Sequence, residues 1–268
     1  MVMKAIADYN PYGWKAKIGL IIPSTNTSNE PEFYRMAPPG VTIHTSRVLL
    51  VGETTQESYL RMAAALADAA ASLATAEVDV VAYSCTSGSI MCPLPQLLKT
   101  MTDQTGTPAT AASGAVVAAL RALGVERVAV ATPYPDLVNE KQKKFLEEHG
   151  FRVSHLKGMD LGHTQEERRA INRVPPEAVF RLARAVDRPD AQAIFISCTA
   201  LPTIDIIAEI EQELGKPVIS SNTAVFWSCL RLLGIKAPVT GYGRLLEQHL
   251  DAIDAADFAV APRTRLRA

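Results

Sequence analysis

Residues 78–89, VDVVAYSCTSGS, and residues 191–203, AQAIFISCTALPT, decide the fold. Each segment runs from an apolar, β-branched stretch into Ser-Cys-Thr and then into residues suited to a helix. The apolar residues are almost continuous rather than alternating, which is typical of parallel strands buried on both faces. The two segments therefore predict two equivalent strand-to-helix turns in an α/β protein.

A second pair of segments repeats in the same way, KIGLIIPSTN at residues 17–26 and RVAVATPYPD at residues 127–136. Each is a buried-strand pattern that closes on proline and polar residues. We therefore expect two similar Rossmann-like lobes with parallel sheets, related by a pseudo-dyad. Because ligands of open parallel sheets bind at the carboxyl ends of the strands, all four turns should meet in the cleft between the lobes. The expected lobes are residues 1–113 with 222–268, carrying Cys85, and residues 114–221, carrying Cys198.

The rest of the chain supports this organisation. Further strands are expected at residues 42–50 and 216–222, and the succession of strands and helices implies βαβ units. An alanine-rich helical face at residues 63–76 is a surface on which a homodimer or larger homo-oligomer could form, with internal packing as the alternative. Helical periodicity predicts helices at residues 55–76, 94–103, 114–123, 135–150, 175–186, 203–214 and 224–233.

The composition excludes several classes of protein. The 268 residues are 48% hydrophobic and 21% charged with a formal net charge of −1, and the basic residues are scattered among acidic ones, so nucleic acid is not an expected partner. No apolar run approaches the ~20 residues of a membrane span, and the N-terminal residues lack the apolar region of a signal peptide. We therefore expect a cytoplasmic protein. The cysteines form no CxxC pair and the histidines have no metal spacing, so no metal site is expected.

Cys85 and Cys198 are the candidate catalytic groups. The small residues after Cys85 leave backbone N–H groups free at a helix N-terminus, a setting that lowers the pKa of a thiol, and SCTAL gives Cys198 the same setting. A buried cysteine is more often a small hydrophobic residue, which is how we interpret Cys92 and Cys229. The repeated Ser-Cys-Thr frame favours reactive thiols at Cys85 and Cys198.

Polar residues at the neighbouring strand ends could bind an acid. Asn26 in PSTN and Tyr134 in ATPYPD can each donate a hydrogen bond to a carboxylate. The alternatives are a turn or cap residue for Asn26 and an exposed turn residue for Tyr134. Asn222 in SSN is more often a cap.

Together, PSTN, YSCTSG, ATPYPD, SCTAL and SSN resemble the maleate isomerase and arylmalonate decarboxylase branch of the aspartate/glutamate racemase superfamily, over residues 17–250. The resemblance implies two α/β lobes that close over a small carboxylic acid, with no cofactor and with paired cysteines acting from opposite faces. It implies that Cys85 and Cys198 carry the chemistry. The residues that it implies for binding substrate carboxylates or an enediolate are Asn26, Thr86, Ser87, Tyr134 and Thr199.

Differences within this branch bear on the reaction. Arylmalonate decarboxylases resemble the chain in TPYPDLVNE and GYGRLLEQ but have only the later thiol, so Cys85 argues against decarboxylation. Maleate isomerases have both thiols and a further carboxylate-binding asparagine about thirty residues before the second. Here Arg168 occupies the corresponding position and Asn172 lies slightly further on, so either could bind substrate. Alternatively, Arg168 belongs to the charged run EERR on a solvated helix face.

Two opposed thiols support two reactions. A thiolate can add to an activated C=C bond and allow rotation, or it can remove an α-proton while the second thiol returns one to the opposite face. The stretches PSTNTSNEPEF and MAPPGVTIHTSR resemble maleate isomerases, which favours conversion of maleate to fumarate over racemisation of an aspartate- or glutamate-type amino acid. The same fold could also serve arylmalonate-type decarboxylation, or non-catalytic binding of a small acid by a catabolic protein.

Overall fold

The computed structural model describes residues 11–254, which contain two four-stranded parallel sheets. The strand order is β2-β1-β3-β4 in the first sheet and β6-β5-β7-β8 in the second. The strands are β1 (Ala16–Pro23), β2 (Val41–Val48), β3 (Val80–Tyr83), β4 (Ala109–Ala111), β5 (Arg127–Thr132), β6 (Arg152–Gly158), β7 (Ala193–Ile196) and β8 (Val218–Ser220).

The two sheets repeat the same order, with β1, β2, β3 and β4 equivalent to β5, β6, β7 and β8. This confirms the prediction of an α/β fold with two parallel sheets, and the residue boundaries of the two lobes stay a prediction. The central strands β1, β3, β5 and β7 are almost completely buried, as their continuous apolar sequences indicate. Two strands were not predicted. β4 has only three residues, and β6 is a half-exposed edge strand with the polar sequence RVSHLKG.

The helices account for most of the remaining residues. The predicted helix at 55–76 is divided into α3 and α4 at Ala65, and the one predicted at 203–214 begins only at Ile207. No residue range was predicted for α2, α5, α9 or α13, although a helix was expected to follow Cys85, where α5 begins. The described helices are α2 (Asn29–Met36), α3 (Gln56–Ala64), α4 (Leu66–Ala74), α5 (Thr86–Met91), α6 (Leu94–Thr105), α7 (Ala112–Ala122), α8 (Asp136–Glu148), α9 (Gln165–Ile171), α10 (Pro176–Val186), α11 (Ile207–Leu214), α12 (Ser221–Leu232) and α13 (Arg244–Gln248).

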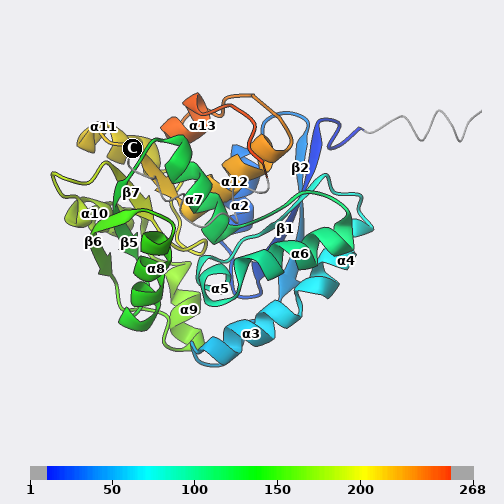
Figure 1. Cartoon of the computed structure of the whole chain (residues 1–268), viewed down its shortest axis with the longest axis horizontal. Helices are drawn as coiled ribbons and strands as arrows, with labels where there is room; N and C mark the ends of the chain where they lie inside the picture. The colour runs from blue at the N-terminus through cyan, green and yellow to red at the C-terminus, as the bar shows by residue number, and fades with distance from the viewer. Residues whose placement is uncertain (1–10, 255–268) are drawn as a thin grey trace, which may run out of the picture.

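The largest part of the core lies between the two sheets. Helices α7 and α12 pack against each other there, and α12 also contacts β3 and β4 of the first sheet (Figure 1). Apolar residues of β1, β5, α7 and α12 form one continuous cluster. Two further clusters fill the outer sides, one under α4 and α6 and the other under α10 and α11. The shared cluster fixes the two sheets relative to each other, and therefore the strand ends that face the site.

The alanine-rich helical face at 63–76 packs largely against other elements of the same molecule. Ala69 and Ala70 on α4 are buried in the cluster that includes residues of β1 and β3. This helical face therefore gives no support to association between copies, which stays a prediction. Within residues 11–254, no helix is long and apolar enough to cross a membrane.

Candidate active site

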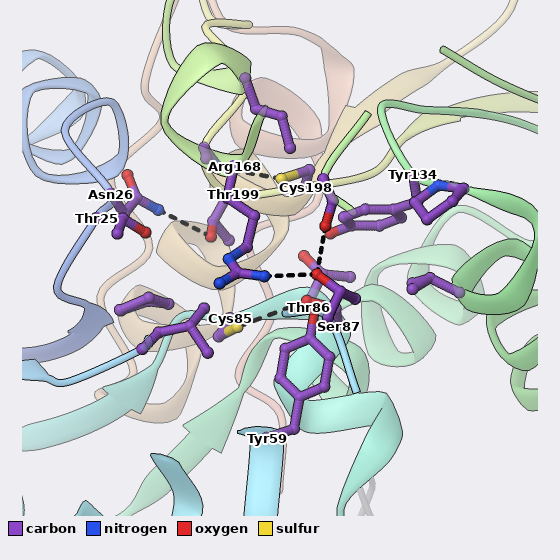
Figure 2. A pocket seen from close by; sticks show the side chains of 18 residues that line it. Thr25, Asn26, Tyr59, Cys85, Thr86, Ser87, Tyr134, Arg168, Cys198 and Thr199 are labelled. Carbon is purple, nitrogen blue, oxygen red and sulfur yellow. Dashed lines mark hydrogen bonds between the residues drawn. The ribbon is translucent and has the colours of Figure 1, made fainter. Parts of the chain in front are cut away.

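The candidate site is a pocket at the carboxyl ends of the central strands of both sheets. Its lining includes the residues that directly follow β1, β3, β5 and β7, so the four predicted turns meet there (Figure 2). The volume open to the centres of water molecules is about 50 Å³. One buried water needs roughly 10–15 Å³ on this measure, so the pocket fits a small molecule. The predicted residues that line it are Asn26, Cys85, Thr86, Ser87, Tyr134, Arg168, Cys198 and Thr199.

Cys85 caps the N-terminus of α5. Its backbone is extended, and its Sγ accepts a hydrogen bond from the backbone N–H of Gly88 at 3.3 Å and lies 3.8 Å from Ser87 Oγ. Gly88 permits this close approach, because a Cβ there would lie 2.4 Å from the Tyr83 hydroxyl and 3.0 Å from the Cys85 sulfur. The predicted setting at a helix N-terminus is therefore present at Cys85.

Cys198 lies in a different local structure, although its sequence frame is the same. Its φ is +104°, a conformation that side chains with a Cβ rarely adopt, and α11 begins only nine residues later. Its Sγ accepts a hydrogen bond from the backbone N–H of Ala200 at 3.4 Å. The expectation that Cys198 stands at a helix N-terminus was wrong, because the chain turns here without starting a helix. The backbone strain at Cys198 is of the kind that concentrates at functional sites.

The two Ser-Cys-Thr turns are hydrogen-bonded to each other. Thr199 donates through Oγ1 to the carbonyl of Ser84 at 3.1 Å. A second link between the turns runs through Ser221. Its Oγ accepts hydrogen bonds from Thr86 Oγ1 at 2.8 Å and from the backbone N–H of Cys198 at 3.1 Å. These buried contacts hold the two cysteine turns in a fixed relation across the interface between the sheets.

Asn26 is both a cap residue, through its Oδ1, and a residue of the pocket, through its Nδ2. Its Oδ1 accepts hydrogen bonds from the backbone N–H groups of Ser28 and Asn29, both at 3.0 Å, as a capping residue does. Its Nδ2 donates to Thr199 Oγ1 at 3.1 Å, which draws the amide to the pocket side (Figure 2). The amide group is therefore held at both ends, with its N–H groups on the side of the site.

Burial governs the acidity of both thiols. Burial raises the pKa of Cys85. The opposing groups, which lower this pKa, are the backbone N–H of Gly88, the hydroxyls of Ser87 and Tyr83 and the positive charge of Arg168. Burial likewise raises the pKa of Cys198 to about 11, although a hydrogen bond from Tyr134 acts in the opposite direction. The expectation of lowered thiol pKa values was wrong in sign, because desolvation outweighs the backbone donors.

The two thiols nevertheless differ in their electrostatic surroundings. Arg168 favours the thiolate of Cys85, whereas a thiolate at Cys85 raises the pKa of Cys198. The pair therefore favours a negative charge on Cys85 and a proton on Cys198.

Two tyrosines complete the polar lining. Tyr134 is buried rather than exposed, and burial and the neighbouring Cys198 raise its pKa, so it acts as a neutral donor. Tyr59 on α3 has a raised pKa through burial and hydrogen-bonds to Ser87. Sequence reasoning missed Tyr59, because it appears there only as an apolar position of a helix.

Arg168 is buried, with 7% of its surface exposed, and it lines the pocket. Its Nη1 donates to Thr54 Oγ1 at 2.6 Å and its Nη2 donates to the carbonyl of Gly52, so α9 is tied to the loop that follows β2. Placement on a solvated face is therefore wrong for Arg168, although its neighbour Arg169 is exposed. The charged run is amphipathic, and the loop at 49–55 covers its inner side.

Asn172 does not line the pocket. Its Oδ1 accepts from the backbone N–H of Thr27 at 2.9 Å, and its Nδ2 donates to the carbonyl of Thr25 at 3.1 Å. It supports the turn that carries Asn26. The structure gives no support to the direct substrate contact predicted for Asn172, because its amide is occupied by this turn.

A buried carboxylate lies behind the site and was not predicted. Glu32 on α2 accepts hydrogen bonds from the backbone N–H groups of Thr203 and Ile204 and from Nδ2 of Asn222 at 2.6 Å. Asn222 also donates to the carbonyl of Thr199 at 3.2 Å. Asn222 is thus part of a buried network rather than a cap, since Ser220 is the N-cap of α12. Burial raises the pKa of Glu32, although these donors lower it.

The arrangement suits acid–base or nucleophilic chemistry by thiols. Within residues 11–254, no group of three or more His, Cys, Asp or Glu side chains could hold a metal ion. The groups that surround the pocket are two thiols, neutral hydroxyl and amide donors, and one guanidinium. This set can bind a small anion between two sulfur atoms.

Comparisons with known proteins agree with this chemistry. The family model described as arylmalonate decarboxylase matches residues 18–246. A maleate isomerase from Nocardia farcinica is 31% identical over 246 residues, which cover 87% of this chain and 96% of the relative. An arylmalonate decarboxylase from Bordetella bronchiseptica is 36% identical over 202 residues, which cover 74% of this chain and 83% of the relative.

The solved structures agree as well. The Nocardia farcinica maleate cis-trans isomerase, as a cysteine-to-serine mutant with a covalently bound succinylcysteine intermediate, matches with a TM-score of 0.79 at 27% identity. The match covers 87% of this chain and 98% of that chain. The chain is therefore an enzyme that belongs to the maleate isomerase and arylmalonate decarboxylase family of the aspartate/glutamate racemase superfamily.

Proposed function

We propose that the protein isomerises a small cis-unsaturated dicarboxylic acid, with maleate to fumarate as the reference reaction. Cys85 acts as the nucleophile and Cys198 as the acid and base. The observation that carries the proposal is the pair of thiols in one pocket, with the positive charge of Arg168 favouring the thiolate of Cys85.

In the first step, the Cys85 thiolate adds to one alkene carbon and forms a C–S bond. The alkene electron pair moves onto the other carbon and its carboxylate, and Cys198 donates a proton to that carbon. The central bond of the resulting succinyl thioether is single, so it rotates. The Cys198 thiolate then removes the proton, the C=C bond forms again in the trans geometry, and the C–S bond breaks to restore the Cys85 thiolate.

The negative charge that develops on the substrate carboxylate needs donors that are already in place. On the side of Cys198, Asn26 keeps a second amide N–H and Tyr134 offers a hydroxyl, whereas the hydroxyl proton of Thr199 is used in its bond to the Ser84 carbonyl and holds the turn in place. On the other side, Thr86 and Ser87 begin α5, so their backbone N–H groups have no acceptor within the helix. Tyr59 bonds to Ser87 and fixes that side.

Decarboxylation of an arylmalonate is the second candidate, because the arylmalonate decarboxylase relative has the higher identity, 36% against 31%. The proton-donating role proposed for Cys198 would serve that reaction as well. Cys85 would then have no step to perform.

One assay separates these reactions. The purified protein is incubated in deuterated water with maleate, with phenylmalonate, and with D- and L-aspartate, and the products are followed by proton NMR. We expect fumarate from maleate and no change in the other substrates. Decarboxylation of phenylmalonate without isomerisation of maleate would replace the proposal with the second candidate, and deuterium exchange at the α-carbon of aspartate would indicate a racemase.

A further inference from the structure

Arg168 carries a buried positive charge without a carboxylate partner. Within residues 11–254, no carboxylate lies in ion-pair distance of its guanidinium, and its two hydrogen-bond acceptors, Thr54 and Gly52, are neutral. A buried charge is costly unless it is paired. Apart from the Cys85 thiolate that the proposed reaction requires, its surroundings therefore lack an anion.

The guanidinium still has one donor without a partner. Its Nε is buried and has no hydrogen-bond partner, although Nη1 and Nη2 both have one. Figure 2 shows the side chain extending into the pocket, with the guanidinium on the side of Cys85. The bonds to the loop at 49–55 restrict its rotation, so the direction of the free N–H is fixed before a ligand binds.

The chain offers an internal comparison. Arg231 is also buried with an unpartnered Nε, but its guanidinium donates to the carbonyls of Ile235, Ala237 and Leu250. These bonds attach α12 to the segment at 235–250, and Arg231 lines none of the pockets described for residues 11–254. Three carbonyl acceptors explain Arg231 as a structural residue. Arg168 has a single carbonyl acceptor and faces a cavity that fits a ligand.

We infer that Arg168 selects for a dianionic substrate by binding its second carboxylate through Nε–H, beside Cys85. The first carboxylate lies among Asn26, Tyr134 and Thr199, so the reacting carbons span the two thiols. This inference rests on the proposed reaction of a dicarboxylate. It adds that the enzyme discriminates a diacid from a monoacid of the same length by the charge of one arginine.

The test measures binding of two unreactive acids that differ in one carboxylate. Succinate and butyrate are titrated calorimetrically into the wild type, Arg168→Met, Arg168→Lys and the matched control Arg169→Met, whose arginine is exposed. A hydrogen bond to a charged group corresponds to a preference of about 10- to 150-fold, so the wild type should prefer succinate by this factor. Arg168→Met should remove the preference, Arg168→Lys should restore part of it, and Arg169→Met should keep it.

The ratio of the two affinities is compared within each variant, so partial unfolding of Arg168→Met lowers both affinities and leaves the ratio readable. A preference that survives in Arg168→Met, or that the wild type lacks, would overturn the inference. Maleate turnover is measured on the same samples. If Arg168→Met loses the succinate preference but the wild type does not isomerise maleate, the carboxylate site is supported and the proposed reaction is refuted. If the wild type isomerises maleate and Arg168→Met does so with an unchanged KM, the proposed reaction is supported and the carboxylate site at Arg168 is refuted.

Discussion

The backbone strain at Cys198 should appear as a difference in stability between two substitutions that both remove the thiol. At φ +104°, a residue with a Cβ is held in a conformation that costs roughly 1–2 kcal/mol, from which glycine is exempt. Both Cys198→Ala and Cys198→Gly remove the thiol, but only the alanine retains the Cβ. Glycine loses about 0.4–1 kcal/mol because it makes the unfolded chain more flexible. The net expectation is that Cys198→Gly is more stable than Cys198→Ala by about 1 kcal/mol.

The same pair of substitutions at Cys229 is the control. Cys229 is fully buried in the middle of α12, where glycine is about 1 kcal/mol less favourable than alanine. Thermal unfolding of all four variants measures both differences. A difference of about 1 kcal/mol corresponds to roughly 2–4 °C in Tm for a chain of this size. We expect Cys198→Gly to melt above Cys198→Ala, and Cys229→Gly to melt below Cys229→Ala.

Both Cys198 variants should lack isomerase activity. Both lack the thiol, so this loss of activity is independent of the backbone strain, which only the difference in stability reports. The reasoning would be refuted if glycine proved less stable than alanine at Cys198 as well, because the positive φ would then carry no strain.

Three further predictions follow from the contacts of the site. Alkylation of Cys85 by iodoacetamide, followed by peptide mass spectrometry, should accelerate as the pH rises, because burial raises the pKa of this thiol and only the thiolate reacts. Arg168→Met should shift this pH profile to still higher pH, and an unshifted profile would exclude an effect of the Arg168 charge on Cys85. Glu32→Gln should lower the free energy of unfolding in denaturant by about 2–4 kcal/mol, because its NH₂ group would face the buried N–H donors of Thr203 and Asn222. An unchanged denaturation midpoint would show that the buried network is dispensable. Cys92→Ala and Cys229→Ala should keep near wild-type kcat in the isomerase assay, and loss of turnover in a folded variant would give these thiols a role.

The repeated strand ends were predictable because their information is local. A continuous apolar strand followed by Ser-Cys-Thr or by proline predicts both the turn and its place at the sheet edge. The positions of Cys85, Cys198 and Tyr134 follow from this. What the pattern could not predict is the conformation after each cysteine, since the same frame leads to a helix at Cys85 and to a strained turn at Cys198.

The remaining features of the site depend on contacts between distant segments. Arg168 appears in the sequence as part of a charged run, and its burial depends on a loop more than a hundred residues earlier. Glu32 appears as an ordinary helical acid, and its partner Asn222 is 190 residues away. The acidity of the thiols was misjudged because their desolvation depends on how closely the two halves pack, which composition and spacing do not reveal.

The most direct test of the proposed reaction is to trap its covalent intermediate. Without the Cys198 thiol, the Cys85 thiolate can still add to the alkene, and the carbanion then takes its proton from the serine hydroxyl or from water. The proton that must be removed before the C–S bond breaks has no thiolate base. Cys198→Ser is incubated with maleate and analysed by intact-protein and peptide mass spectrometry, with Cys85→Ser treated in parallel. We predict an adduct with the mass of one maleate on Cys85 in Cys198→Ser, and no adduct at residue 85 or 198 in Cys85→Ser. An adduct on another cysteine, or full isomerisation by Cys85→Ser, would contradict the assignment of Cys85 as the nucleophile.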